Sequence, residues 1–389
     1  MTKQIPSGDG STPPLALYIH FPWCVRKCPY CDFNSHAPRG GEIPADAWAA
    51  AVVADLEAAL PQIRGRCVHS VFIGGGTPSL LPAPVLEKLL DALRARLLLA
   101  PEAEITLEAN PGTADAARFG ACRDADVNRL SLGVQSFDDG MLARIGRIHD
   151  GDGARRAVED ALSRFARVNV DLMYGLPGQT LAMALADVET ALAFGVGHLS
   201  CYHLTLEPGT PFARNPPVLP GDDAAADMQD AIEARLADAG FGHYEVSAFA
   251  RAGQECQHNL NYWTFGDYLG LGPGAHGKLT VSGGVVREVR HRHPARYLEG
   301  AARGDFVQAR RMVGAAELPF EFLMNALRLP DGVSWGLFRE RTGLSPDVMA
   351  DGLAEARARG LLDASPDRLR ATARGQRFLN DLLQIFLPE

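Results

Sequence analysis

Short apolar runs alternate with longer amphipathic segments through the first 240 residues of the chain. Six of these runs predict β-strands, over residues 15–21, 68–73, 104–108, 128–134, 168–173 and 198–204. Segments with apolar residues at helical spacing predict helices over 45–60, 82–99, 114–123, 151–165, 181–194 and 221–240. Strands and helices that alternate with short connections are typical of parallel βα units.

The number of repeats indicates the shape of the sheet. Eight βα repeats close into a barrel, whereas six are expected to leave the barrel open on one side. We therefore predict an α/β fold with an open, partial (β/α)6 barrel over residues 15–245. Glycines and isolated polar residues follow the ends of the strands, which is the rim where (β/α) barrels carry their active sites.

The rest of the chain follows other patterns. Residues 1–14 are polar and lack the apolar stretch of a signal peptide, so we expect a disordered tail. The stretch 246–312 is irregular and rich in glycine and aromatic residues, and we expect it to connect two domains. Residues 313–389 predict helices around a hairpin, as in a winged-helix-like α+β module.

Composition and charge exclude several classes of protein. Apolar residues make up 47% of the chain and charged residues 22%, which is typical of a soluble globular protein. The net charge of −9 disfavours broad binding to nucleic acid. Residues 317–389 contain 9 arginines and 11 acidic residues, so we expect a packing or partner module there and no DNA binding. No apolar run approaches the roughly 20 residues of a membrane span.

Three of the seven cysteines, Cys24, Cys28 and Cys31, form a C-x-x-x-C-x-x-C motif directly after the first predicted strand. They could be ordinary loop cysteines or part of a zinc site, but zinc usually takes paired C-x-x-C units and no second pair exists. Thiolates are also the ligands of iron–sulfur clusters. Three thiolates on a 4Fe-4S cluster would leave one iron open to another ligand. Such a cluster needs reducing conditions, and we therefore expect a cytoplasmic protein.

The cysteine spacing, on the loop after a first strand, resembles the signature of the radical S-adenosylmethionine (SAM) superfamily. The resemblance implies a 4Fe-4S cluster bound by Cys24, Cys28 and Cys31, with SAM chelated to the open iron. The glycine run 74–76, followed by Thr77 and Pro78, resembles the motif that binds the methionine end of SAM in this superfamily.

Motifs along the chain resemble a narrower group, the oxygen-independent coproporphyrinogen III oxidase family. They lie at residues 18–24, 75–78, 133–137, 146–147 and 171–177. The resemblance covers about residues 15 to 385 and includes a winged-helix-like end. Carried over by motif, the SAM contacts would be Tyr18, Tyr30, Gly75, Gly76, Thr77, Glu108, Gln135, Arg147 and Asp171.

Three departures indicate the subfamily. The oxidases carry a further cysteine two residues after the motif, where this chain has Phe33, and they have a longer N-terminal extension. This chain also contains His258-Asn-Leu-Asn-Tyr262-Trp263, which resembles the H-N-x-x-Y-W motif of the sister subfamily, the heme chaperones (HemW type). The resemblance implies a protein that binds heme and transfers it to acceptor proteins. The alternatives are coproporphyrinogen III oxidation, which we do not expect, and an unrelated radical SAM reaction.

Residues His258, Tyr262 and Trp263 are the candidate heme contacts, since histidine is a common heme ligand and aromatic rings stack on porphyrin. They could equally form part of a loop core. The axial ligand stays open among His258 and the neighbouring His243, His276, His291 and His293. Three arginines are candidates for the heme propionates, or else form a solvated face, namely Arg287, Arg290 and Arg292.

The subfamily also implies partners. They are heme, heme-accepting proteins of the respiratory chain and an electron donor for the cluster. Respiratory acceptors would bring the protein into transient contact with membrane proteins. The sequence leaves open the oligomeric state and whether SAM is cleaved.

Overall fold

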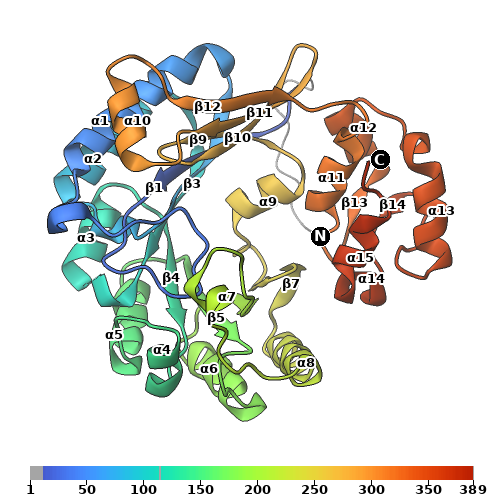
Figure 1. Cartoon of the computed structure of the whole chain (residues 1–389), viewed down its shortest axis with the longest axis horizontal. Helices are drawn as coiled ribbons and strands as arrows, with labels where there is room; N and C mark the ends of the chain where they lie inside the picture. The colour runs from blue at the N-terminus through green and yellow to red at the C-terminus, as the bar shows by residue number, and fades with distance from the viewer. Residues whose placement is uncertain (1–11, 114, 389) are drawn as a thin grey trace.

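The computed structural model describes residues 12–113 and 115–388, and one twelve-stranded sheet lies at its centre (Figure 1). Strands β1 to β6 are neighbours in this sheet, and each pairs in parallel with the next. They are Leu15–Phe21, Cys67–Gly75, Leu98–Ala109, Arg129–Gln135, Val168–Tyr174 and His198–His203. The sheet curves but does not close, which confirms the predicted open α/β barrel.

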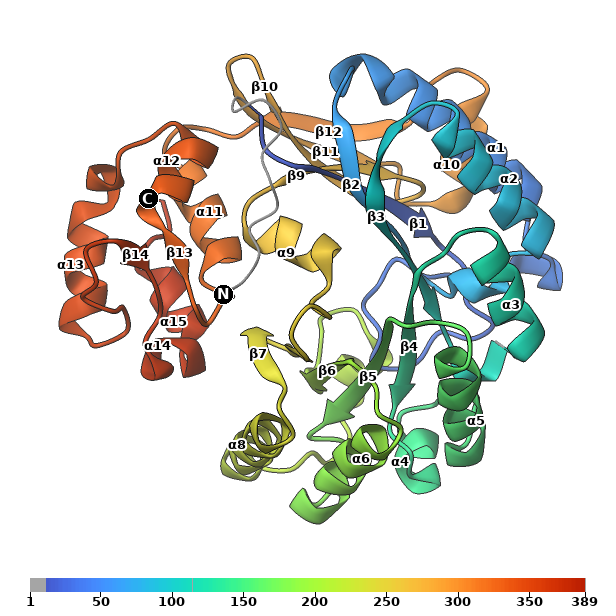
Figure 2. The same cartoon turned by 180° about the vertical axis from the view of Figure 1, so that it is seen from behind.

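Helices cover the outer face of the curved sheet (Figure 2). They are α1 Ala45–Ala59, α2 Ala83–Arg94, α3 Ala116–Asp124, α5 Gly151–Leu162, α6 Leu181–Ala193 and α8 Asp222–Asp238, with the short α4 Asp139–Arg144 and α7 Pro211–Arg214 between them. Each covering helix buries an apolar stripe, as α2 does with Leu86, Leu89 and Leu93. The helix predicted over 82–99 is shorter than expected, because residues 98 and 99 already belong to β3.

Residues 246–312, predicted as an irregular connection, instead extend the sheet. Four strands continue it beyond β1, with β9 parallel to β1 and the others antiparallel, and β8 and β7 extend it beyond β6. The polar residues Lys278, Glu288 and Arg290 are buried in these strands and obscure their apolar pattern. The elements are β7 Gly242–Glu245, β8 Ala248–Ala250, β9 Asp267–Leu271, β10 His276–Val281, β11 Gly284–Arg290, α10 Pro294–Ala301 and β12 Val307–Met312.

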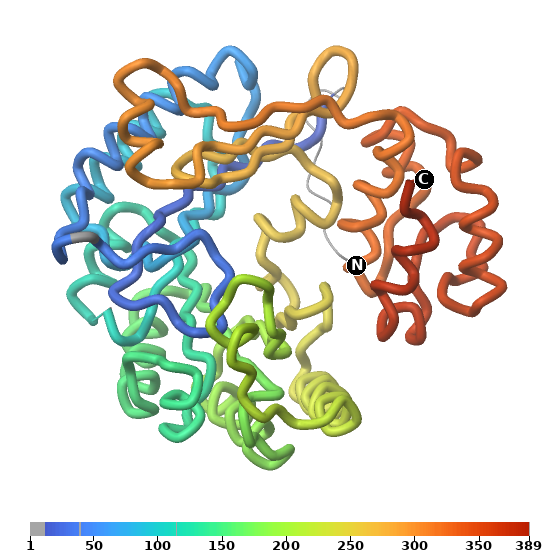
Figure 3. Tube along the Cα trace, viewed as in Figure 1, coloured from blue at the N-terminus to red at the C-terminus, as the bar shows by residue number. Residues whose placement is uncertain are grey.

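The C-terminal module follows β12 along a single connection (Figure 3). It consists of helices around a short two-stranded sheet, as predicted from the hairpin pattern. The last helical segment is divided into two helices at Phe378. The elements are α11 Leu318–Ala326, β13 Val333–Ser334, α12 Trp335–Thr342, α13 Ala350–Ala358, β14 Arg368–Leu369, α14 Ala373–Arg377 and α15 Leu379–Gln384.

Helix α9, Gln257–Trp263, lies in the opening between the barrel and the C-terminal module (Figures 1 and 2). Leu260 and the adjoining Phe265 belong to the apolar core of the module. The Arg328 guanidinium of the module lies over the Trp263 ring, 4.4 Å from its centre. The helix is therefore packed against both parts of the chain.

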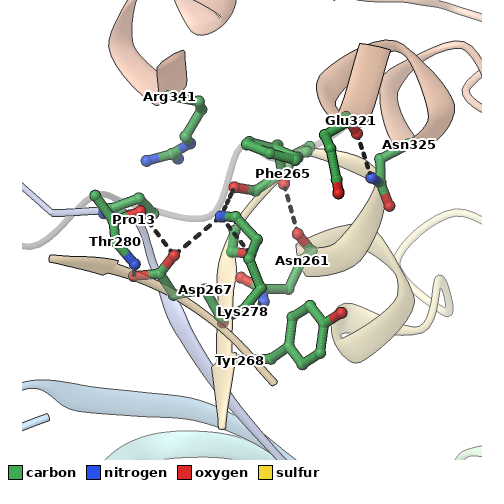
Figure 4. Close-up of polar contacts among 12 residues, drawn as sticks. Pro13, Asn261, Phe265, Asp267, Tyr268, Lys278, Thr280, Glu321, Asn325 and Arg341 are labelled. Carbon is green, nitrogen blue, oxygen red and sulfur yellow. Dashed lines mark hydrogen bonds and ion pairs between the residues drawn. The ribbon is translucent and has the colours of Figure 1, made fainter. Parts of the chain in front are cut away.

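A buried lysine lies next to this junction (Figure 4). Lys278 Nζ donates to the Phe265 carbonyl and pairs with Asp267 Oδ1, both at 2.9 Å. The ammonium also lies 4.0 Å from the centre of the Phe265 ring. Burial lowers the pKa of Lys278 to about 8, and its three contacts stabilise the charged form against that effect.

A disordered tail was expected over residues 1–14. Residues 1–11 of it lie outside the described part of the chain. Pro13 and Pro14 are buried, contrary to the expectation of disorder. Their carbonyls accept hydrogen bonds from the Arg66 side chain and the Asp267 backbone. None of the helices in the described part of the chain is long and apolar enough to cross a membrane.

Candidate functional site

The three motif cysteines lie on the loop after β1, at the carboxyl end of the strand. All are half-buried free thiols. Burial raises the pKa of both Cys24 and Cys31, which disfavours free thiolates there in the absence of a bound cation. Each sulfur has a polar neighbour: Thr77 donates to Cys24 Sγ at 3.3 Å, Arg147 donates to Cys28 Sγ at 3.6 Å, and the Ser35 hydroxyl lies 3.9 Å from Cys31 Sγ.

This arrangement fits an iron–sulfur cluster. Among the described residues, no three His, Cys, Asp or Glu side chains are placed to bind one metal ion together. A four-iron cluster does not need its ligands to converge on one point, because each thiolate binds a separate iron. Donors to sulfur such as Thr77 and Arg147 are the kind of contact that tunes the potential of a cluster.

Gly75 and Gly76 end β2 directly against the cysteine loop. Backbone N–H groups of Gly76 and Thr77 donate to the carbonyls of Phe21 and Trp23 at 2.7 and 2.8 Å. A Cβ on Gly76 would collide with the Trp23 carbonyl, and Gly75 has a φ of 110° that favours glycine. Glycine is therefore required where the strand end and the loop meet.

Glu108 lies at the end of the next strand and contacts the same glycine run. Its carboxylate accepts a hydrogen bond from Gly75 N at 2.9 Å. Burial, with a smaller contribution from Asp171, raises the pKa of Glu108 to about 7. The group is thus poised to change protonation near neutral pH, as many binding-site carboxyls are.

The side chains of Gln135 and Arg147 both lie next to Gly133. Gln135 has a φ of 73°, an unusual backbone conformation for a residue other than glycine and one that is frequent at functional sites. Arg147 donates to the Gly133 carbonyl and contacts Tyr30. The Arg147 Nε is buried without a hydrogen-bond partner in the described structure, so the guanidinium has capacity for an anionic group.

Asp171 lies on β5, in register with residues of β4 and β6. It accepts hydrogen bonds from Asn169 at 2.7 Å and from Ser131 at 3.4 Å. Burial raises its pKa. All nine residues carried over for SAM thus lie on β1 to β5 or on the loops that follow these strands.

One large cavity adjoins these strand ends. Its volume is about 720 Å³, within the roughly 300–1,000 Å³ typical of ligand sites. Tyr18, Gly75 and Glu108 line it on the barrel side, whereas Tyr262 and Trp263 line it from α9. The other lining residues are His20, Phe33, Asn34, Tyr268, Gly274, His276, Val289, Arg292, Gln308 and Asn325.

The candidate heme ligand His258 lies behind this wall and does not line the cavity. Only 1% of the residue is exposed. Nδ1 lies 3.0 Å from the Ser70 hydroxyl and Nε2 lies 2.9 Å from the Tyr262 hydroxyl, so both ring nitrogens already have partners. The geometry matches the loop-core alternative for His258, while Tyr262 and Trp263 reach the cavity.

The three candidate arginines divide in the same way. Arg287 pairs with Glu321 and donates to the Tyr268 hydroxyl, and Arg290 is buried in ion pairs with Asp55 and Glu288. Arg292 lines the cavity, and its guanidinium has no hydrogen bond or ion pair within residues 12–113 and 115–388. It is the arginine available to an anionic ligand.

Sequence reasoning did not single out Glu104, whose carboxylate is buried at 2% exposure. It pairs with Arg167 at 2.9 Å and accepts the backbone N–H groups of Gln257 and His258. No signal in the sequence distinguishes Glu104 from the other polar residues of the same predicted strand, Thr106 and Glu108. Phe33 was noted only as a departure from the oxidases, and its position on the cavity wall was not anticipated.

Comparisons with known proteins agree with this geometry. Residues 18–191 match the radical SAM superfamily, and residues 314–378 match the HemN C-terminal domain. The heme chaperone HemW of Escherichia coli (strain K12) is 49% identical over 379 residues, which cover 97% of this chain and 99% of that protein. HemW of Haemophilus influenzae is 45% identical over 383 residues, with the same coverage of both chains.

A solved structure supports the fold. Coproporphyrinogen III oxidase (HemN) from Escherichia coli superposes with a TM-score of 0.82 over 96% of this chain and 90% of that one. Their sequences are 22% identical, so this likeness concerns the fold. An open barrel with three cysteines on its first loop, together with these matches, defines a radical SAM protein. Within that superfamily, the chain belongs to the HemW heme chaperone family.

Proposed function

We propose that this protein binds heme in the cavity and transfers it to acceptor proteins. The observation that carries the proposal is the cavity wall formed by Tyr262 and Trp263, with the unpaired Arg292 on the same cavity. Aromatic rings and a cation suit a flat macrocycle with carboxylate side chains. The names of the relatives support the same assignment.

The residues have separate roles in this proposal. Cys24, Cys28 and Cys31 would hold the 4Fe-4S cluster, which with SAM supplies one-electron chemistry when both are bound. Tyr18, Gly75 and Glu108 line the cavity and are also predicted SAM contacts, so SAM would adjoin the heme through them. His258 acts indirectly, by orienting the Tyr262 hydroxyl.

The proposal extends to location and partners. We place the protein in the cytoplasm, where half-buried thiols stay reduced, and infer an electron donor for the cluster. The acceptors would be heme proteins of the respiratory chain.

The test is an anaerobic heme titration of the reconstituted protein, followed by gel filtration. We expect one heme to remain bound to each chain and to pass to an apo-acceptor on mixing. In a parallel incubation with SAM, reductant and coproporphyrinogen III, we expect no carbon dioxide. Release of carbon dioxide at turnover would favour the oxidase function instead.

A further inference from the structure

If the cavity binds heme, as in the proposed function on which this step rests, a histidine of the chain can serve as the axial ligand of the iron. An axial imidazole needs a ring nitrogen that faces the cavity and has no other partner. Of the chain's eleven histidines, His20 and His276 line the cavity. The other nine, including His258, lie elsewhere.

His20 cannot serve without losing its present contacts. Its Nδ1 lies 3.0 Å from the Tyr18 hydroxyl, and its Nε2 lies 2.9 Å from the Asn34 carbonyl. The residue is buried at 5% exposure, and a Cβ on Gly75 would collide with its ring. It fastens β1 to the cysteine loop.

His276 differs in each respect. It begins β10, the residue is open to solvent over part of its surface, and its ring makes no hydrogen bond to any residue that the structure describes. It pairs in register with Val289 of β11, so both side chains lie on one face of the sheet, and both line the cavity. Burial, then Arg287 and Arg292, lowers the pKa of His276, which favours the neutral ring that iron requires.

The cysteine loop contributes an exposed aromatic ring to the cavity. Phe33, on the cysteine loop, is 59% exposed and lines the cavity. The Asn34 amide donates to the carbonyls of Pro273 and Arg292 at 2.9 and 2.8 Å, which fixes this loop to the segments on either side of β10 and β11. Together with Tyr262, Trp263 and Val289, Phe33 gives the cavity an apolar lining that suits a flat macrocycle.

We infer that His276 is the axial ligand of heme iron, with Phe33 as an apolar contact of the macrocycle and Arg292 as the partner of a propionate. The iron would then lie against strands β10 and β11 and not against the H-N-x-x-Y-W helix.

The experiment compares His276→Ala with His69→Ala and His258→Ala in full-length, cluster-reconstituted protein. His69 is the matched control, because it is half-buried on β2 and does not line the cavity. We expect His276→Ala to shift the Soret band and to lower heme affinity roughly tenfold or more, as loss of a metal ligand does. Added imidazole should restore the band. His69→Ala should match the wild type, and the cluster spectrum should be unchanged in each variant.

The outcomes separate the inference from the proposed function. If the wild type binds heme and His276→Ala keeps the same Soret band, with no response to imidazole, the assignment is wrong while the chaperone function stands. If the wild type binds no heme, the proposed function is wrong, and the assignment of His276 is wrong with it. Should His276→Ala not fold, His276→Met tests the same point, because a thioether ligand would change the spin state and the Soret maximum while largely preserving side-chain volume.

Discussion

The Glu104 carboxylate of β3 accepts a hydrogen bond from the backbone N–H of His258 in α9, at 3.1 Å. Near the end of the same strand, Glu108 accepts a hydrogen bond from Gly75, one of the predicted SAM contacts. Because α9 carries Tyr262 and Trp263, β3 contacts both the glycine run and the helix that forms the aromatic wall of the cavity. The buried Glu104 carboxylate also pairs with Arg167 at 2.9 Å.

We expect Glu104→Ala to destabilise the protein strongly. Removal of one partner of a buried ion pair costs about 3–5 kcal/mol, since Arg167 and the α9 N–H groups would lose their acceptor. Urea denaturation measures the change in the free energy of unfolding. Glu57→Ala is the control, because Glu57 pairs with Arg96 at the surface and such pairs contribute at most about 1 kcal/mol. Equal losses in the two variants would contradict the role of Glu104.

Replacement of any one of the three motif cysteines by alanine should abolish the 4Fe-4S absorbance of the reconstituted protein, because each thiolate binds its own iron. Cys67→Ala, Cys122→Ala, Cys201→Ala and Cys256→Ala should retain it, since these cysteines lie outside the loop. Iron content and the visible spectrum are the measurements. A requirement for any of those four would rule out the three-ligand site.

Asp171→Asn should weaken SAM binding without loss of iron. A charged hydrogen bond at a buried position is worth about 1.5–3 kcal/mol, or roughly tenfold or more in affinity. Calorimetric titration with SAM measures the effect. Asp150→Asn, at the start of α5, should bind SAM as the wild type does, because Asn also caps helices. Unchanged affinity in a folded Asp171→Asn variant would remove Asp171 from the SAM site.

Glu108 should make stability depend on pH. Its pKa in the folded protein, about 7, lies above the ordinary value of 4.5, so the folded state binds more protons than the unfolded state between these values. The contribution of Glu108 to the free energy of unfolding is therefore full below about pH 4.5 and falls until about pH 7.

Glu108→Gln lacks this titration. Urea denaturation of both proteins at about pH 4.5 and about pH 8 should show the wild type losing more stability than the variant as pH rises. A constant difference between them would mean that Glu108 ionises at its ordinary pKa.

Much of the barrel could be predicted from sequence, because its strands are apolar runs between amphipathic helices. The cysteine and glycine motifs lie at the strand ends where the pattern placed them. Strands β9 to β12 could not be predicted, because the buried residues Lys278, Glu288 and Arg290 interrupt their apolar pattern. Arg290 is also paired with Asp55, a residue far away in the sequence. The cavity could not be predicted either, because residues far apart in the sequence form it. Its wall brings together Phe33, Trp263 and Asn325, and no local signal relates them.

Helix α9 lies in a part of the chain that neither family match covers. The radical SAM match ends at residue 191 and the HemN C-terminal match begins at residue 314. Helix α9 and strands β9 to β12 lie between them. The segment that neither match covers therefore supplies Tyr262, Trp263, His276 and Arg292 to the cavity. Substitutions in this interval would change the lining of the cavity without altering the cysteine loop or the C-terminal module. An exchange of residues 246–312 between relatives, rather than of either matched domain, is the graft that should transfer ligand preference.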